Sequence, residues 1–335
     1  MWTKRQRLEA TIRGEPADRT PVALWRHFPG DDQYPDELAR SQIDFQRTYD
    51  FDFMKVTPSS SYCVQDWGLT TIYEGNLEGT RAYVNRRIQE PEDWYQLEPL
   101  DPRNGALGRQ IECLRLIGAE LGDEVPFIQT IFNPLAQARY LAGGERLLAH
   151  LRAHPEAVRT GLRVITDSIV RFVAEVCQAG AAGIFLAVQH ASHRLLSEDE
   201  YRRFGEPFDR QVLEALTPAA WFNVLHLHGE DVMFDLLANY PVQAINWHDR
   251  ETAPMLSEAL RRTRGRALIG GLRQWETMVR GTPPNVRAEI ADALAQTAGG
   301  RRLIIGTGCV TPIVAPLANL RAARQAVDNS AGGRA

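Results

Sequence analysis

Two short segments carry side chains that suit metal-dependent chemistry. Residues 225–229 (Leu-His-Leu-His-Gly) and 306–309 (Gly-Thr-Gly-Cys) each stand at the end of a short apolar run. His226 and His228 are two positions apart on a predicted strand, so their side chains share one face. Cys309 ends another predicted strand and can meet them. Nitrogen and sulfur ligands with a fourth position left for water or substrate are typical of a catalytic zinc site.

Eight short apolar runs are predicted to be the strands that position these side chains. Most of them lack a polar alternation, as expected of parallel strands that are buried on both faces. They are Pro21–Trp25, Phe53–Thr57, Pro126–Phe132, Gly183–Gln189, Phe222–His228, Ala244–Trp247, Ala267–Gly271 and Leu303–Thr307.

Helical patterns lie between these strands. The clearest are Gly144–Ala153, Pro155–Ala179, Ser197–Leu216, Arg287–Thr297 and Pro316–Val327. We expect Ser197 to cap the third of them, with Glu200 completing a capping box.

The alternation of eight strands with helices predicts an α/β fold, a (β/α)8 TIM barrel. The alternative is an open doubly wound sheet, but no Gly-x-Gly-x-x-Gly turn follows the first strand. The segment between the second and third strands, about residues 59–124, is predicted to be an insertion over the mouth of the barrel. We expect one domain over residues 1–329 and a flexible tail at 330–335.

Composition excludes several classes of function. The chain has 335 residues, of which 44% are hydrophobic, and a formal net charge of −4 without a basic stripe, which argues against nucleic acid as a partner. No apolar run approaches the roughly 20 residues of a membrane helix. The four cysteines are widely spaced and form no Cys-x-x-Cys pair, which favours a reducing cytoplasm over a disulfide framework.

Further polar side chains lie at the predicted strand ends. Arg26 and His27 follow the first strand and suit an anionic substrate group, although an ion pair within the barrel is an equal alternative for Arg26. Lys55 lies in an apolar run, so an inward-pointing Lys55 needs a partner or a depressed pKa. His248 follows the sixth strand and either lines the site or forms a salt link within its loop. We assign Arg26, Lys55 and His248 as the catalytic residues of the predicted site.

Neutral hydrogen-bonding groups come at the third and fourth strands. Gln129 and Gln189 are predicted to contact the substrate, with ordinary polar lining of the barrel as the alternative reading. His190 follows Gln189 and is placed with these substrate-binding residues.

Three segments resemble the uroporphyrinogen decarboxylase superfamily. They are residues 4–22 near the N-terminus, residues 196–201 (Leu-Ser-Glu-Asp-Glu-Tyr) in the middle and residues 306–321 near the C-terminus. The resemblance covers nearly the whole chain, and it implies a (β/α)8 barrel in agreement with the strand count. It also implies two branches of function.

The decarboxylase branch uses no metal and holds substrate carboxylates with an Arg-x-x-x-Arg stretch. Arg26 matches its first arginine, but Gly30 stands in place of the second, and Lys55 lies near an expected aspartate. His190 stands where the family has another aspartate, and Thr307 replaces a late histidine. A substrate with eight carboxylates needs several cations placed to pair with them, so these departures argue against this branch.

The second branch contains zinc-dependent methyltransferases that work with a corrinoid. His226 and Cys309 match the histidine and the last cysteine of its metal ligands, and His228 replaces the middle cysteine. Histidine remains a good zinc ligand. One fewer thiolate leaves the metal more positive, which favours lowering the pKa of a bound water or thiol.

We therefore predict an enzyme that transfers a methyl group between a small substrate and a corrinoid. The metal would be Zn²⁺, the corrinoid would be carried by a partner protein, and the family analogy implies a homodimer. Two alternatives stay open: a metal-free decarboxylase that acts on a porphyrinogen or another carboxylated substrate, and a non-catalytic tetrapyrrole-binding protein.

Overall fold

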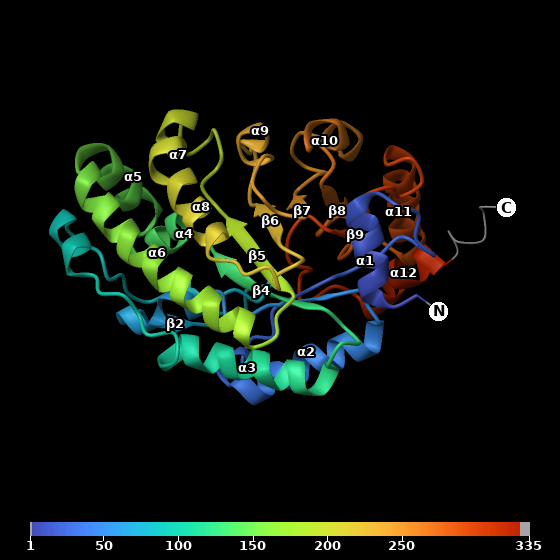
Figure 1. Ribbon diagram of the computed structural model, residues 1–335, viewed down its shortest axis with the longest axis horizontal. Helices are drawn as coiled ribbons and strands as arrows, with labels where there is room; N and C mark the ends of the chain where they lie inside the picture. Colours follow the sequence, from blue (N-terminus) through green and yellow to red (C-terminus); the bar gives the residue numbers. More distant parts are fainter. Residues whose placement is uncertain (1, 329–335) are drawn as a thin grey trace.

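Seven runs of buried residues form a curled parallel sheet at the centre of the protein. A computed structural model describes residues 2–328 and gives the strand order β1-β4-β5-β6-β7-β8-β9 (Figure 1). Every residue of these strands is buried, which accounts for the missing polar alternation. The strands are β1 (Met54–Val56), β4 (Phe127–Phe132), β5 (Gly183–Val188), β6 (Val224–Leu227), β7 (Ala244–Trp247), β8 (Ala267–Leu272) and β9 (Leu303–Thr307).

The predicted first strand, 21–25, is reduced to a single parallel bridge between Val22 and Ile305 of β9. On one side Ala23 N donates to Ile305 O at 2.9 Å, and on the other Asp52 N donates to Val22 O at 2.9 Å. Pro21 has no N–H with which to lengthen the ladder. The same segment thus contacts both edges of the sheet, and the fold is α/β and consistent with a TIM-like barrel.

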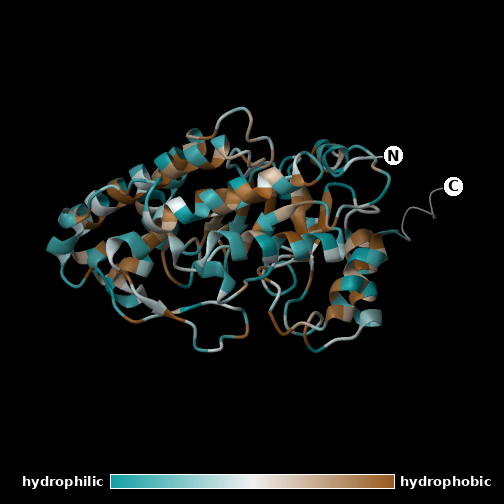
Figure 2. Cartoon of the chain, turned by 90° about the horizontal axis from the view of Figure 1, so that it is seen from below, coloured by the Kyte–Doolittle hydropathy of each residue, from teal (hydrophilic) through white to brown (hydrophobic). Residues whose placement is uncertain are grey.

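Helices pack around the outside of the strands (Figure 1). They are α1 (Lys4–Arg13), α2 (Pro35–Tyr49), α3 (Gly105–Leu121), α4 (Pro134–Ala142), α5 (Gly144–Ala153), α6 (Pro155–Gln178), α7 (Glu198–Phe204), α8 (Glu206–Glu214), α9 (Phe234–Leu237), α10 (Leu256–Arg262), α11 (Pro283–Gln296) and α12 (Leu317–Asp328). Hydrophilic and hydrophobic residues alternate along them, as amphipathic helices require (Figure 2). None of the helices in residues 2–328 has the length and apolarity needed to span a membrane. The predicted tail at 330–335 lies outside the described residues.

The chain between β1 and β4 contains several short elements. Two strands, β2 (Thr71–Ile72) and β3 (Ala82–Tyr83), pair antiparallel. The 3-10 helices η2 (Tyr62–Trp67) and η3 (Pro91–Gln96) flank this pair, α3 follows, and a third 3-10 helix, η1 (Asp31–Gln33), precedes α2. The loop between β2 and β3 contributes Glu78 and Thr80 to the central cavity.

The helix predicted over Ser197–Leu216 is wrong as one element, because the structure divides it into α7 and α8 at Gly205. Pro207 in the first turn of α8 has no N–H to continue the hydrogen bonds of α7. The predicted start is confirmed, since Ser197 and Glu200 form the capping box.

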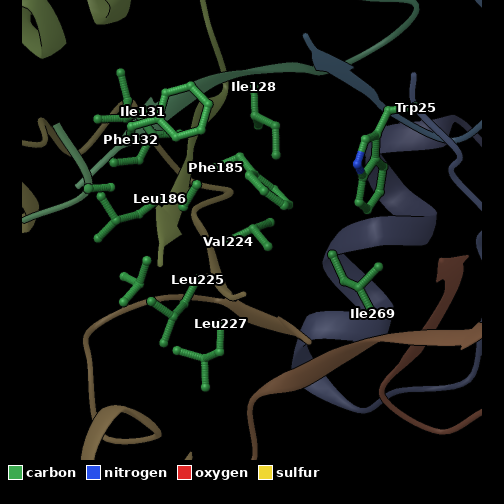
Figure 3. Packing of buried hydrophobic residues seen from close by; sticks show 14 of the residues in the cluster. Trp25, Ile128, Ile131, Phe132, Phe185, Leu186, Val224, Leu225, Leu227 and Ile269 are labelled. Carbon is green, nitrogen blue, oxygen red and sulfur yellow. The ribbon is translucent and has the colours of Figure 1, made fainter. Parts of the chain in front are cut away.

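Aromatic side chains fill the inside of the curled sheet. Trp25 and Phe185 face each other with ring centroids 5.4 Å apart (Figure 3). Phe53 lies 6.2 Å from Trp25 and 4.9 Å from Phe222, again between ring centroids. These contacts form an apolar base beneath the polar residues at the carboxyl ends of the strands.

The buried carboxylate of Asp52 joins three parts of the chain. It accepts hydrogen bonds from Arg7 of α1 at 2.7 Å, from Arg19 at 2.7 Å and from the backbone N–H of Val22 at 2.8 Å. Asp52 is 0% exposed, so these donors replace its water completely. The helix before the barrel and the 21–25 segment are therefore held beside β1.

We predict that Asp52→Ala lowers the free energy of unfolding by about 3–5 kcal/mol, because two buried guanidinium groups lose the buried carboxylate that they share. Asp18→Ala is the matched control, since the side chain of Asp18 is 34% exposed, pairs with Arg7 and otherwise accepts a hydrogen bond from the backbone N–H of Arg19. We expect it to cost less than about 1 kcal/mol. Urea unfolding measures both, and equal losses would contradict this role of Asp52.

A second buried carboxylate, Asp209 of α8, ties α4 and α7 together. It accepts hydrogen bonds from the hydroxyl groups of Tyr201 and Tyr240 and from Asn133, which caps α4. Burial outweighs these hydrogen bonds and raises the pKa of Asp209 from 3.8 to about 6.

The raised pKa of Asp209 makes stability depend on pH. The folded state holds this proton more tightly than the unfolded state, so its contribution is complete below about pH 4 and is lost as the pH rises through about 6. Relative to Asp209→Asn, the wild-type free energy of unfolding should fall by up to about 1.4 kcal/mol per pH unit in that window. Denaturant titrations at pH 4.5, 5.5 and 7 measure the difference, and a constant or rising difference would refute the assignment.

Candidate metal centre

Four side chains from three strand ends converge on one point. They are His226 of β6, His228 just after β6, His248 just after β7 and Cys309 just after β9. Each offers one ligand atom, and these atoms lie within 4.8 Å of one another. The carboxyl ends of parallel strands meet at one edge of a sheet, which brings positions 226 and 309 together.

The orientation of His226 is fixed by Asn246 of β7. Asn246 Nδ2 donates to the carbonyl oxygens of Ile269 and Thr307 at 2.9 and 3.0 Å, so its Oδ1 faces the imidazole. That oxygen lies 2.7 Å from His226 Nδ1, which must therefore carry the proton. Nε2 of His226 keeps its lone pair, and it is buried with no hydrogen-bond partner in residues 2–328. Burial lowers the pKa of His226.

His248 has the same arrangement with a charged partner. Its Nδ1 lies 2.9 Å from Glu251 Oε2, and its Nε2 is buried without a hydrogen-bond partner among the described residues. A carboxylate behind a histidine ring is the usual support of a metal-binding histidine. Burial lowers the pKa of His248, but Cys309 and Glu251 outweigh burial and raise it to about 10.

Cys309 supplies a thiolate. Its burial alone would raise the pKa, but the neighbouring imidazoles of His226, His228 and His248 outweigh burial, and the pKa lies well below 9. Sγ lies 3.7 Å from Nδ1 of His228. The thiolate is the form of cysteine that binds metal ions.

Gly308 is needed to bring Cys309 to this place. A Cβ at position 308 would lie 2.7 Å from Cα of His248 and 3.2 Å from the carbonyl oxygen of Trp247. Only glycine lets the chain after β9 pass this close to the end of β7. The Gly-x-Gly-Cys run is therefore explained by packing as well as by chemistry.

The four side chains fit a zinc ion. Tetrahedral zinc with nitrogen ligands at about 2.0–2.1 Å and sulfur at about 2.3 Å keeps its ligands roughly 3.3–3.8 Å apart. The spread of up to 4.8 Å is wider by about 1 Å. Side-chain rotations close such a difference, and the two unpartnered Nε2 atoms already face the cluster.

A cavity of about 250 Å³ opens beside this cluster. Trp25, Phe132 and Phe185 form apolar walls, and Glu78 and Thr80 reach it from the loop between β2 and β3. Its volume is just below the roughly 300–1,000 Å³ of pockets for drug-sized ligands. The cavity therefore suits a small molecule next to a metal ion.

The structure brings most of the predicted site residues to this cavity. The predicted metal ligands His226, His228 and Cys309 line it. So do the predicted substrate contacts His27 and Gln189 and the predicted catalytic residue Lys55.

Two of these residues, His27 and Gln189, offer different hydrogen-bonding groups to the cavity. Nδ1 of His27 donates to the carbonyl oxygen of Pro58 at 3.1 Å, and burial followed by the charge of Lys55 lowers its pKa to about 4. His27 is therefore neutral with Nε2 as an acceptor. Gln189 Oε1 accepts from the Tyr140 hydroxyl at 2.8 Å, which leaves the amide nitrogen of Gln189 as a donor.

Besides His248, which belongs to the metal cluster, three predicted site residues lie outside the cavity lining. Arg26 packs over the rings of Phe28 and Phe45 and hydrogen bonds to Ile313 O at 3.4 Å. Gln129 is 0% exposed. Its Oε1 accepts a hydrogen bond from Gln110 Nε2, and its Nε2 donates one to the carbonyl oxygen of Thr130.

His190, the third residue outside the lining, is 2% exposed, and its Nδ1 has no hydrogen-bond partner within residues 2–328. Burial, followed by the charges of Arg139 and His228, lowers its pKa to about 3. The ring is therefore neutral at physiological pH.

Sequence reasoning missed Asn246, Trp25 and Glu78. Asn246 carried a signal, since a polar residue inside an apolar strand and two positions before His248 must share its face. Trp25 ends a predicted strand and was not assigned to the site. Glu78 lies in a loop with no local pattern, and only the tertiary structure brings it to the cavity.

The chain belongs to the uroporphyrinogen decarboxylase (URO-D) family, whose model matches residues 3–330. This confirms the family predicted from the sequence. Both of its branches occur among the relatives.

Methylcobamide:CoM methyltransferase MtbA of Methanosarcina acetivorans is 21% identical over 337 residues, which cover 96% of this chain and 96% of that protein. A uroporphyrinogen decarboxylase of Xanthomonas axonopodis pv. citri is 24% identical over 335 residues, covering 89% of this chain and 90% of its own. A solved methyltransferase from Methanosarcina mazei has a TM-score of 0.83 at 18% identity, over 98% of this chain and 99% of that one, which shows a shared fold. The relatives are enzymes by name, in agreement with the prediction of an enzyme.

We predict that Asn246→Leu weakens zinc binding by about 10- to 100-fold, because His226 loses the acceptor that sets its tautomer. Asn133→Leu is the matched control, since this buried asparagine bonds to Asp209 and to the N–H of Ala136 and to no histidine of the cluster. Competition with a chromogenic chelator measures both affinities. A full zinc affinity in a folded Asn246→Leu protein would show that the hydrogen bond has no such role.

Proposed function

We propose that this chain is a zinc-dependent methyltransferase that acts on a small thiol or alcohol and exchanges the methyl group with a corrinoid on a partner protein. The observation that supports this proposal most directly is the cluster of four possible ligand atoms, which lie within 4.8 Å of one another. Two of them are imidazole nitrogens without a hydrogen-bond partner in the described residues. A zinc ion held there would act as a Lewis acid that lowers the pKa of a bound thiol or alcohol. The relatives that are methyltransferases by name support the same reaction class.

The residues around the cluster have separate tasks in this proposal. His226, His228 and Cys309 hold the metal, and His248 is a fourth ligand or contacts the reacting group directly. The amide nitrogen of Gln189, held by Tyr140, donates a hydrogen bond to the substrate. Neutral His27 offers an acceptor.

The architecture that we propose completes the barrel with residues 21–25 as a short eighth strand. Residues 59–124 are then an insertion over its mouth, in one domain that spans 1–329. The proposal includes a corrinoid protein as the partner that exchanges the methyl group, and we keep the homodimer as part of it.

The lining of the cavity argues against a porphyrinogen substrate. Lys55 is the one lysine or arginine among the residues that line it in the described part of the chain. A porphyrinogen with eight carboxylates needs several cations, and a cavity of about 250 Å³ is small for a tetrapyrrole.

Zinc content tests the metal site. We expect about one zinc per chain in the wild type after reconstitution. Loss of a hydrogen bond that supports a metal ligand typically lowers metal affinity by about 10- to 100-fold. His226→Ala and Cys309→Ser remove a ligand itself, so each should lower zinc affinity by more than that. His154→Ala is the matched control, because this exposed histidine lies outside the cluster.

Methyl transfer is then measured with free methylcobalamin and small thiols as probes. The wild type should consume methylcobalamin with a thiol present, and the two ligand variants should not. A wild-type protein that binds no zinc would exclude the proposed function, and so would a zinc-loaded protein that transfers no methyl group to any thiol or alcohol.

A further inference from the structure

Lys55 is a buried cation without an anionic partner. It is 5% exposed, lies within β1, and forms none of the ion pairs found in residues 2–328. Its Nζ contacts Thr57 Oγ1 at 3.5 Å and lies 4.8 Å from the ring centroid of Phe185. Burial lowers its pKa to about 7, opposed by the nearby Cys309 thiolate. An unpaired buried ammonium destabilises a fold, so its presence in a cavity points to a ligand.

Trp25 independently indicates that a ligand binds in this part of the cavity. Its indole N–H is buried and has no hydrogen-bond partner in the described chain, although its ring lines the same cavity. Lys55 Nζ lies 5.8 Å from the centroid of that ring. In Figure 3 the indole nitrogen is on the edge of the ring that faces Phe185. Two neighbouring donors, one of them charged, thus lack an acceptor.

The protein's own acceptors do not fill this need. Thr57 donates its hydroxyl proton to the Lys55 carbonyl oxygen at 3.2 Å, and its oxygen is an uncharged acceptor 3.5 Å from the ammonium. Glu78 lines the cavity but bonds to Trp275 and interacts with Cys309, His228 and His248 instead. Glu78, the acidic residue of the cavity lining, therefore interacts with the metal cluster and not with Lys55.

The cation and the metal cluster share one wall. The ring of Phe185 stacks on His226 with centroids 5.1 Å apart and lies 4.8 Å from Lys55 Nζ. One small molecule can therefore reach the cluster and the ammonium together.

From this geometry we propose that Lys55 and Trp25 bind an oxyanion at the far end of the substrate, whose thiol or alcohol reacts at the metal cluster. The substrate class is then a short thiol or alcohol with a carboxylate or a comparable anionic group. This inference rests on the proposed function for the reacting end only. The oxyanion site stands on Lys55 and Trp25.

The oxyanion site is tested first without metal, with propionate as the probe. Metal-free wild-type protein should bind propionate in ligand-observed NMR titrations, and Lys55→Met should weaken binding by about 10- to 100-fold. Trp25→Phe removes the indole N–H but keeps a ring, and it should cost about fivefold. Lys4→Met is the matched control, since Lys4 is the other lysine of the chain and pairs with Asp50 at the surface.

A stability measurement guards against misfolding of the variant. Lys55→Met removes a buried unpaired charge, so its thermal midpoint should equal or exceed that of the wild type. A folded Lys55→Met protein that binds propionate as well as the wild type overturns the inference.

Binding of thiols to the zinc-loaded protein then tests the metal cluster and the oxyanion site together. 3-Mercaptopropionate should bind at least about 10-fold more tightly than 1-propanethiol, and Lys55→Met should remove this preference. Equal binding of the two thiols overturns the inference and leaves the methyltransferase proposal intact. Propionate binding that depends on Lys55, in a protein that takes up no zinc, would uphold the oxyanion site and reject the proposed function.

Discussion

The side-chain amide of Asn246 is the interaction on which the site depends. It donates to backbone oxygens of β8 and β9 and accepts from His226 of β6, while its own backbone belongs to β7. One residue therefore connects four neighbouring strands inside the sheet. Because each amide atom has its partner, the orientation of the amide is unambiguous, and with it the tautomer of His226. An aspartate at 246 would lose the donor half of this arrangement, and a leucine would lose both halves.

This constraint requires the side chains of the cluster to lie on strands or directly after them, and not on long loops. His226 lies within β6, and His248 and Cys309 follow the ends of β7 and β9 by one and two residues. Buried parallel strands move little, so ligand atoms on them hold their separations without a metal. The Asp52 contacts serve the same end at the opposite edge of the sheet, where they hold residues 19–22 beside β1. Trp25 comes shortly after residues 19–22 and Lys55 lies in β1, and both side chains line the same cavity.

The sequence predicted the parts of this structure that depend on local pattern. Seven strands are close to their predicted bounds, because continuous apolar runs are the signature of buried parallel strands. His226 and His228 were found because a period of two puts them on one face, and Cys309 because the family resemblance and a strand end agreed. The break at Pro207 was missed although its cause is local. The positions of Glu78 and Trp275 had no local cause, since a loop between β2 and β3 meets the chain after β8 only in the folded protein.

Charge links the two ends of the cavity. A divalent ion with one thiolate and neutral imidazoles carries a net charge of about +1. The ammonium of Lys55 adds another positive charge in the same cavity, while burial raises the pKa of Glu78 and reduces its tendency to ionise. A thiolate or alkoxide with one carboxylate brings two negative charges and balances both. With cysteine in place of His228, the metal end would be neutral before the substrate binds. In the proposed function, the histidine at 228 and the lysine at 55 would together neutralise a small anion that carries one negative charge at each end.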